Sequence, residues 1–177
     1  MAALAALFIQ RQPMFGSHQE VGICFSIALV VAGLALRSWG GGSAGQHTRS
    51  GQIEAPQLTT GGPYAYVRNP IYLGSIVLGL GMIGLVSDPR LLVLYVLTFI
   101  ILYTIIVPAE ERFLQKAFGE HYERYRRAVP QMIPRLRPWQ ERTERPFDWR
   151  VLRGEACIAG ILVVIYQTLR LAEHLRS

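Results

Sequence analysis

A short polar run between two apolar parts of the chain contains the residue types best suited to binding a charged ligand. In residues 61–74, GGPYAYVRNPIYLG, tyrosines surround Arg68-Asn69-Pro70. Pro70 disfavours the α conformation at Asn69 and suits the first turn of a helix, so we predict a helix start here. The first N–H groups of that helix, beside an arginine, favour an anionic group such as a carboxylate or phosphate. An aromatic belt at a membrane interface, followed by a helix start, is the alternative explanation.

A pair of carboxylates, Glu110 and Glu111, ends a later apolar run. Such charges are ordinary where a helix simply continues into water. However, the apolar runs at residues 71–87 and 91–109 are separated only by a tight turn, which makes them antiparallel neighbours. The start of the first run and the end of the second then meet at one face. We therefore expect Glu110 or Glu111 to project toward the tyrosine–arginine run.

Four uncharged runs, at residues 21–36, 71–87, 91–109 and 156–169, determine the predicted fold class. A membrane-spanning helix needs about 20 mostly apolar residues, and these runs reach that length alone or with their flanks. The sequence thus predicts an all-α, polytopic integral membrane protein with about four transmembrane helices. Residues 1–9 are too short to span and lack the charged start of a signal peptide, so we expect an interfacial or partly inserted segment there.

The net charge of +6 comes from basic residues in loops, which argues against nucleic acid as a partner. These residues gather after residues 21–36 and after residues 91–109, in two segments on one side of the predicted hairpin. By the positive-inside rule this side is cytoplasmic, although Arg170 and Arg176 favour the opposite orientation weakly. We expect the functional end to face the cytoplasm.

The remaining polar features predict little chemistry. Cys24 and Cys157 lie in apolar runs and are interpreted as small hydrophobic residues. The histidines lack the spacing of metal ligands, so no metal site is predicted. The run GGGSAG at residues 40–45 follows no strand and matches no phosphate-binding loop. We expect a flexible linker there, inside a long polar loop that ends near Thr60 and is either a lid or disordered.

Residues 113–129 have the pattern of an amphipathic helix lying on the cytoplasmic membrane surface. Apolar and aromatic residues recur at helical spacing, and charged residues occupy the other face. Pro130 ends this helix, and Gly119 is expected to bend it.

Together these groups suit a zwitterionic ligand. A carboxylate would take an ammonium group, Arg68 or helix N–H groups would take a carboxylate, and tyrosine rings would suit an adenine or a sulfonium cation. S-adenosylmethionine has all of these parts, although the residue types do not single it out.

Two linked motifs resemble the signature of the isoprenylcysteine carboxyl methyltransferase and phospholipid methyltransferase superfamily. The first is Gly62-Pro63-Tyr64-x-Tyr66-Val67-Arg68-Asn69-Pro70-x-Tyr72-x-Gly74. The second is Glu110-Glu111-x-x-Leu114-x-x-x-Phe118-Gly119-x-x-Tyr122-x-x-Tyr125-x-x-x-Val129-Pro130-x-x-x-Pro134. The resemblance covers residues 34–134 of a single predicted domain, 1–177, with an additional membrane helix at residues 151–172.

The resemblance implies an integral membrane enzyme that transfers a methyl group from S-adenosylmethionine to a lipophilic acceptor entering from the bilayer. It implies that the cofactor is bound by Tyr64, Arg68, Asn69, Pro70, Tyr72, Gly74, Glu110, Glu111, Tyr122 and Tyr125. Ionised acceptors need no dedicated base, because positioning and desolvation supply most of the acceleration. For an amine acceptor, Glu111 is the predicted proton acceptor.

Two departures and two alternatives accompany this prediction. Asn69 stands where the prenylcysteine enzymes often have histidine, and the chain continues beyond Pro134 with a further span. One alternative is an NADPH-dependent membrane sterol or enone reductase, whose family has a related turn. The other is a non-catalytic membrane protein that holds anionic lipids through its arginines.

Overall fold

The structure, a computed structural model, describes residues 19–45, 57–87, 89–143 and 145–175. Within these ranges the chain forms helices α2 (Gln19–Ala44), α3 (Pro70–Val86), α4 (Pro89–Ala128) and α5 (Val151–His174), and a 3-10 helix, η3 (Gly62–Ala65). The interfacial segment expected at residues 1–9 lies outside the described residues.

Three of the described helices are long and apolar enough to cross a membrane, namely α2, α4 from Leu91, and α5 up to Leu169. The fourth, α3, is apolar but has only 17 residues. Large apolar side chains such as Leu94, Ile101 and Val164 are exposed on these helices, as expected where lipid covers them. The prediction of an all-α polytopic integral membrane protein is confirmed, with three long helices and one shorter one.

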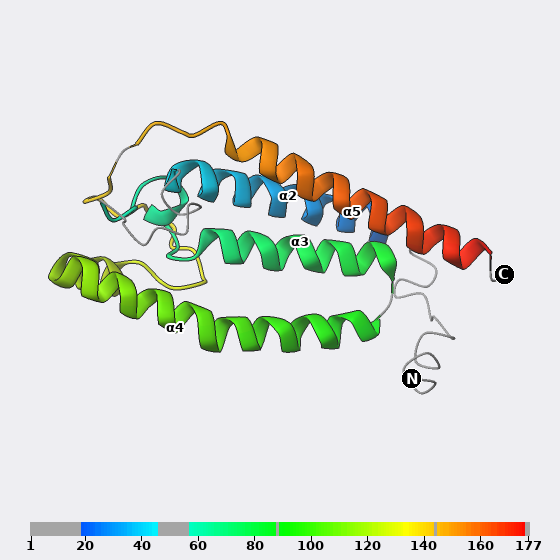
Figure 1. The fold of residues 1–177 in the computed structure, drawn as a ribbon, viewed down its shortest axis with the longest axis horizontal. Coiled ribbons are helices and arrows are strands. Elements are labelled where there is room, and N and C mark those ends of the chain that lie inside the picture. Colours follow the sequence, from blue (N-terminus) through cyan, green and yellow to red (C-terminus); the bar gives the residue numbers. More distant parts are fainter. Residues whose placement is uncertain (1–18, 46–56, 88, 144, 176–177) are drawn as a thin grey trace.

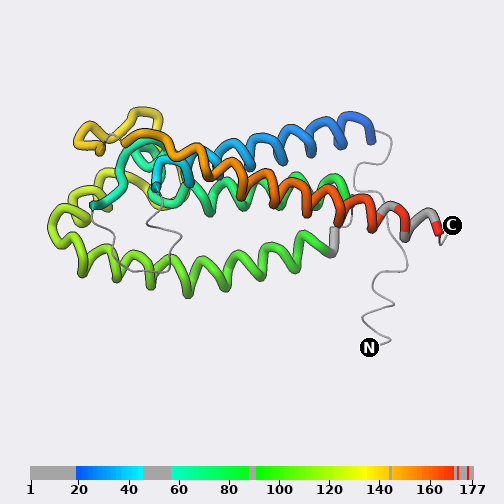
Figure 2. The backbone as a smooth tube through the Cα atoms, turned by 45° about the horizontal axis from the view of Figure 1, so that its top comes forward, coloured from blue at the N-terminus to red at the C-terminus, as the bar shows by residue number. Residues whose placement is uncertain are grey.

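The helices α2, α3, α4 and α5 run side by side along the long axis of the molecule (Figure 1). At one end, η3, the last turns of α4 and the segment between α4 and α5 come together, and Figure 2 shows α4 turning back there. This end is also where α3 begins, so it brings the two predicted motifs together.

Helices α2 and α3 make the most extensive contact of any pair. A Cβ atom added at Gly33 would lie 2.7 Å from the Gly74 carbonyl oxygen, and one added at Gly74 would lie 2.9 Å from the Gly33 carbonyl oxygen. Small residues of this kind let membrane helices approach backbone to backbone. The α2–α3 pair therefore forms the rigid support on which α3 presents its first turn.

The flexible linker predicted at residues 40–45 is wrong for most of its length, because α2 continues through Ala44. Its glycines are needed for close packing. A Cβ atom at Gly40 would lie 2.9 Å from Ile71 Cγ1, and one at Gly42 would lie 2.1 Å from Phe147 Cε2. The glycines thus admit α3 and the α4–α5 connection against the end of α2. The rest of the long loop, residues 46–56, lies outside the described residues.

The predicted bend at Gly119 is confirmed. Gly119 has φ 51° and ψ −124°, a backbone conformation that side chains with a Cβ rarely adopt. The helical turns beyond it carry Tyr122, Tyr125 and Val129, which pack on Leu58 and Trp139 of the protein itself. Part of the amphipathic face that was expected to lie on the membrane therefore forms a small hydrophobic core next to the first motif.

Candidate functional site

The backbone of the tyrosine–arginine run is held by the segment that follows α4. The Arg68 N–H donates to the Pro130 carbonyl at 2.9 Å, and the Arg135 N–H donates to the Tyr66 carbonyl at 3.0 Å. A third bond runs from the Trp139 N–H to the Ala65 carbonyl at 2.9 Å. These bonds satisfy backbone groups that a buried turn would otherwise leave unpaired. They fix the conformation of the first motif against the second.

Tyr122 and Tyr125, in the last turns of α4, stabilise this run. Each is only 2% exposed, and the Tyr125 hydroxyl donates to the Tyr64 carbonyl at 2.8 Å. The Tyr125 ring also lies 5.2 Å from that of Trp139, centroid to centroid. In this structure both tyrosines contact other parts of the chain, so their direct contact with a cofactor stays a prediction.

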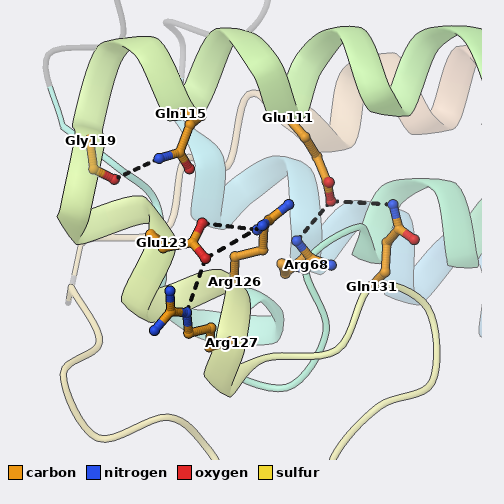
Figure 3. A network of polar contacts seen from close by, with 8 residues as sticks. All are labelled: Arg68, Glu111, Gln115, Gly119, Glu123, Arg126, Arg127 and Gln131. Carbon is orange, nitrogen blue, oxygen red and sulfur yellow. Dashed lines mark hydrogen bonds and ion pairs between the residues drawn. The ribbon is translucent and has the colours of Figure 1, made fainter.

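An ion pair between Arg68 and Glu111 is the centre of the site (Figure 3). Arg68 Nη1 lies 2.8 Å from Glu111 Oε1, and the two side chains are 12% and 19% exposed. Gln131 joins them, because its side-chain amide donates to the same Glu111 oxygen at 3.2 Å. The Asn69 amide in turn donates to the Gln131 carbonyl at 3.3 Å. The residues just before α3, the middle of α4 and the segment after α4 thus share one polar network.

The second glutamate, Glu110, lies beside the first turn of α3. Its carboxylate is exposed and accepts a hydrogen bond from the Tyr72 hydroxyl at 3.0 Å. Tyr64 is close to both groups. Burial, with the charge of Glu110 and the neighbouring Tyr72, raises the pKa of the Tyr64 phenol well above its usual range. Tyr64 is therefore a neutral side chain at physiological pH.

Few buried polar side-chain atoms in the described part of the chain lack a hydrogen-bond partner, and they belong to Arg68 and Tyr103. The contact of Arg68 Nη1 with Glu111 is close enough for an ion pair but does not have hydrogen-bond geometry, and Arg68 Nε has no acceptor. The Tyr103 hydroxyl, on α4, is also without a partner. Buried donors of this kind are costly unless a water molecule or a ligand completes them.

Two other predicted site residues have structural positions. Pro70 is buried at the first position of α3 and begins that helix, as predicted. Gly74 is buried against α2, where a Cβ atom would lie 2.8 Å from Arg37 Cγ. Gly74 thus allows α2 and α3 to pack, and any contact with a cofactor stays a prediction.

Sequence reasoning missed Gln131 and Tyr103. Gln131 directly follows Pro130 of the second motif, and this position could have marked it as a candidate site residue. Its partner Asn69, however, is distant in the sequence. Tyr103 lies inside an apolar run and precedes Glu110 by seven residues, about two helical turns, which places both on one side of α4. Among the described residues, no group of three or more His, Cys, Asp or Glu side chains could hold a metal ion.

Comparison with known proteins decides the family. The sequence profile described as phospholipid methyltransferase matches residues 21–121, more than half of the 177-residue chain. The chain belongs to the phospholipid methyltransferase family. The matched region includes the first motif, the α3–α4 hairpin and both glutamates, so the family resemblance inferred from the motifs is confirmed.

Curated proteins similar to this family member match over a shorter stretch. The protein-S-isoprenylcysteine O-methyltransferase of Schizosaccharomyces pombe is 38% identical over 77 residues, 44% of this chain and 33% of that protein. The cobalt-zinc-cadmium resistance protein CzcN of Cupriavidus metallidurans is 34% identical over 79 residues, 45% of this chain and 36% of that protein. The matched stretch thus spans about a third of each relative's length. No solved structure matches the chain.

Proposed function

We propose that this protein is a membrane methyltransferase that transfers a methyl group from S-adenosylmethionine to a lipophilic acceptor. The observation that carries the proposal is the convergence of Arg68, Glu110, Glu111 and Tyr72 where α3 begins and α4 leaves the apolar region. Membership of the phospholipid methyltransferase family and the similarity to an isoprenylcysteine O-methyltransferase support the same reaction class.

The polar groups of this site fit the charged parts of S-adenosylmethionine. Arg68 has a buried Nε donor without an acceptor, which suits the carboxylate of an amino acid. Glu110 is an exposed carboxylate beside Tyr72, which suits an ammonium group. When bound, the cofactor supplies an electrophilic methyl group on a positively charged sulfur. Tyr64 and Tyr72 remain neutral, and their rings suit that cation.

Glu111 acts in this proposal as a positioning residue for Arg68. Its Oε1 atom is already contacted by Arg68 and by Gln131, so it holds the guanidinium in a fixed orientation. Fixed, partly buried donors bind charged groups more strongly than mobile, solvated ones. For an amine acceptor, Glu110 is the less engaged of the two carboxylates, whereas the sequence pointed to Glu111 as proton acceptor.

The acceptor is proposed to enter from the bilayer, with the site at the cytoplasmic face. In support, α4 leads from an apolar stretch with exposed Ile101 and Ile105 directly to Glu110. Exposed arginines at positions 124, 126, 127 and 137 lie on the same end, as the positive-inside rule expects for a cytoplasmic segment. The lipophilic acceptor would then reach the first turn of α3 from the membrane, and the cofactor would reach it from the aqueous side.

Transfer of a labelled methyl group tests the proposal. The protein in detergent micelles is incubated with methyl-tritiated S-adenosylmethionine and a total membrane lipid extract, and organic-phase radioactivity is counted. The wild type and the exposed-site control Glu120→Gln should label the organic phase, and Arg68→Gln should lower labelling at least about tenfold. No labelling above heat-inactivated protein, together with lipid-dependent oxidation of NADPH, would replace the methyltransferase with the reductase.

A further inference from the structure

Tyr103 is a buried polar group that the proposed function does not use. It lies in α4, within the apolar part of the helix, and its hydroxyl has no hydrogen-bond partner in the described part of the chain. A second tyrosine of the same helix behaves differently, because the Tyr95 hydroxyl donates to the Ser75 carbonyl at 2.6 Å. An apolar helix position accommodates a tyrosine hydroxyl at little cost only when that hydroxyl finds an acceptor.

The surroundings of the Tyr103 hydroxyl connect it to the site. It lies next to the Asn69 side chain and within electrostatic range of Arg68 and Glu111. Asn69 directs its amide hydrogen to the Gln131 carbonyl, and the Glu111 Oε1 atom is occupied by Arg68 and Gln131. These contacts use the Asn69 amide hydrogen and one oxygen of Glu111, and the Tyr103 hydroxyl has no partner of hydrogen-bond geometry among the described residues.

A second available donor is in the same neighbourhood. Arg68 Nε is buried and unpartnered, and the Nη1 contact with Glu111 leaves that atom without a hydrogen bond. A neutral hydroxyl donor on α4 and a guanidinium donor just before α3 suit an oxygen atom with negative charge, because charge-assisted hydrogen bonds are the strongest available to them. A purely apolar ligand would leave both donors unsatisfied.

We infer that Tyr103 and Arg68 together bind an anionic oxygen, of a carboxylate or a phosphate, in the ligand-bound protein. This inference rests on the proposed function and adds a binding residue to it. The anion has two sources of the same chemistry. It is either the carboxylate of the cofactor or the anionic head of the acceptor, and the position of Tyr103 within the apolar part of α4 makes the second source accessible from the bilayer.

Binding calorimetry with Tyr103→Phe, in detergent micelles, tests this inference with paired probes. S-adenosylhomocysteine carries the amino-acid carboxylate, and 5′-methylthioadenosine lacks it. N-acetyl-S-farnesylcysteine carries an acceptor-like carboxylate, and its methyl ester has none. Tyr166→Phe, the same chemical change on α5, is the matched control. Loss of one hydrogen bond to a charged group should weaken binding of one anionic probe about tenfold or more, while its uncharged counterpart is unaffected.

The outcomes separate the sources and the proposals. Weaker binding of S-adenosylhomocysteine alone assigns the anion to the cofactor, and weaker binding of N-acetyl-S-farnesylcysteine alone assigns it to the acceptor. If the wild type binds S-adenosylhomocysteine but Tyr103→Phe binds every probe as the wild type does, only this inference is overturned, and water is the hydroxyl's partner. Equal weakening of charged and uncharged probes overturns it as well. A wild type that binds no anionic probe contradicts both this inference and the proposed function.

Discussion

Arg68 and Glu111 meet across the α3–α4 hairpin, with Arg68 Nη1 2.8 Å from Glu111 Oε1. One residue precedes the first turn of α3, and the other stands where α4 leaves its apolar stretch. The ion pair therefore joins the two sequence motifs directly. Because Gln131 also donates to Glu111, the segment after α4 is connected to the same pair.

A double-mutant cycle on Arg68→Gln and Glu111→Gln should reveal this coupling. Each single change leaves a partly buried group without its partner and should lower the free energy of unfolding by about 1–3 kcal/mol. The double variant should lose less than the sum, with an interaction energy of about 0.5–3 kcal/mol. Thermal or denaturant unfolding in detergent micelles measures all four proteins. Strict additivity would show that the two residues act independently.

Glu155→Gln should loosen the docking of α5. Glu155 forms a bidentate ion pair with Arg37 of α2, at 3.0 and 3.2 Å, and Arg37 also donates to the Ser75 hydroxyl. The Arg37 and Glu155 side chains are only 18% and 8% exposed. Replacing Glu155 leaves the largely buried charge of Arg37 unpaired, which should lower the free energy of unfolding by about 3 kcal/mol. The exposed Glu141→Gln is the control and should unfold at the wild-type temperature. Equal stability of the two variants would contradict a structural role for the ion pair.

Gly33→Ala and Gly160→Ala form a matched pair that tests the α2–α3 contact. A Cβ atom at Gly33 would lie 2.5 Å from the Leu78 backbone nitrogen, whereas one at Gly160 meets nothing within 4 Å. Gly33→Ala should therefore destabilise by about 1–3 kcal/mol through overpacking. Gly160→Ala should be neutral or stabilise by up to about 1 kcal/mol, since alanine favours the helix. Unfolding temperatures that move together for both variants would disprove the close contact.

Gly119→Ala tests the bend in α4 by backbone conformation alone. An added Cβ atom there meets nothing within 4 Å, but φ is +51°, which a residue with a Cβ adopts only under strain. The expected loss of stability is about 1–3 kcal/mol. Binding of S-adenosylhomocysteine should weaken in parallel, because the turns beyond Gly119 hold the Tyr64 carbonyl through Tyr125. If Gly119→Ala were as stable as the wild type, α4 could continue straight through position 119 without loss of stability, which would contradict a required bend.

The raised pKa of Tyr64 predicts a loss of stability in alkali. Since the folded protein holds this proton more tightly than the unfolded chain, the contribution is complete below the unfolded pKa, near 10. It is lost progressively as the pH rises above that value toward the folded pKa. Unfolding temperatures measured from pH 8 to pH 11.5 should therefore fall more steeply for the wild type than for Tyr64→Phe. Parallel curves would contradict burial of the phenol.

The sequence predicted the parts of this structure that depend on local pattern or on a short connection. Apolar runs indicated the membrane helices, and the short turn before α4 correctly placed Glu110 and Glu111 beside the first turn of α3. Gly119 was recognised as a bend because glycine breaks an otherwise regular amphipathic pattern.

Contacts between distant segments could not be predicted in the same way. Arg37 was counted among the loop charges, yet its partner Glu155 is 118 positions away and no local pattern links them. From the sequence alone, the glycines at positions 40 and 42 indicated a flexible linker. Their role in packing depends on α3 and Phe147, which are distant from them in the sequence. Tyr103 could not be recognised as a site residue for a related reason, since a tyrosine in an apolar run usually faces lipid or the protein core.

The most direct test of the proposed methyltransferase site is calorimetric binding of S-adenosylhomocysteine, and separately of NADPH, to the detergent-purified wild type and Glu111→Gln. The account predicts micromolar binding of S-adenosylhomocysteine by the wild type, a loss of at least about tenfold in the variant, and no binding of NADPH. Binding of NADPH alone, or S-adenosylhomocysteine binding unchanged by Glu111→Gln, would contradict it.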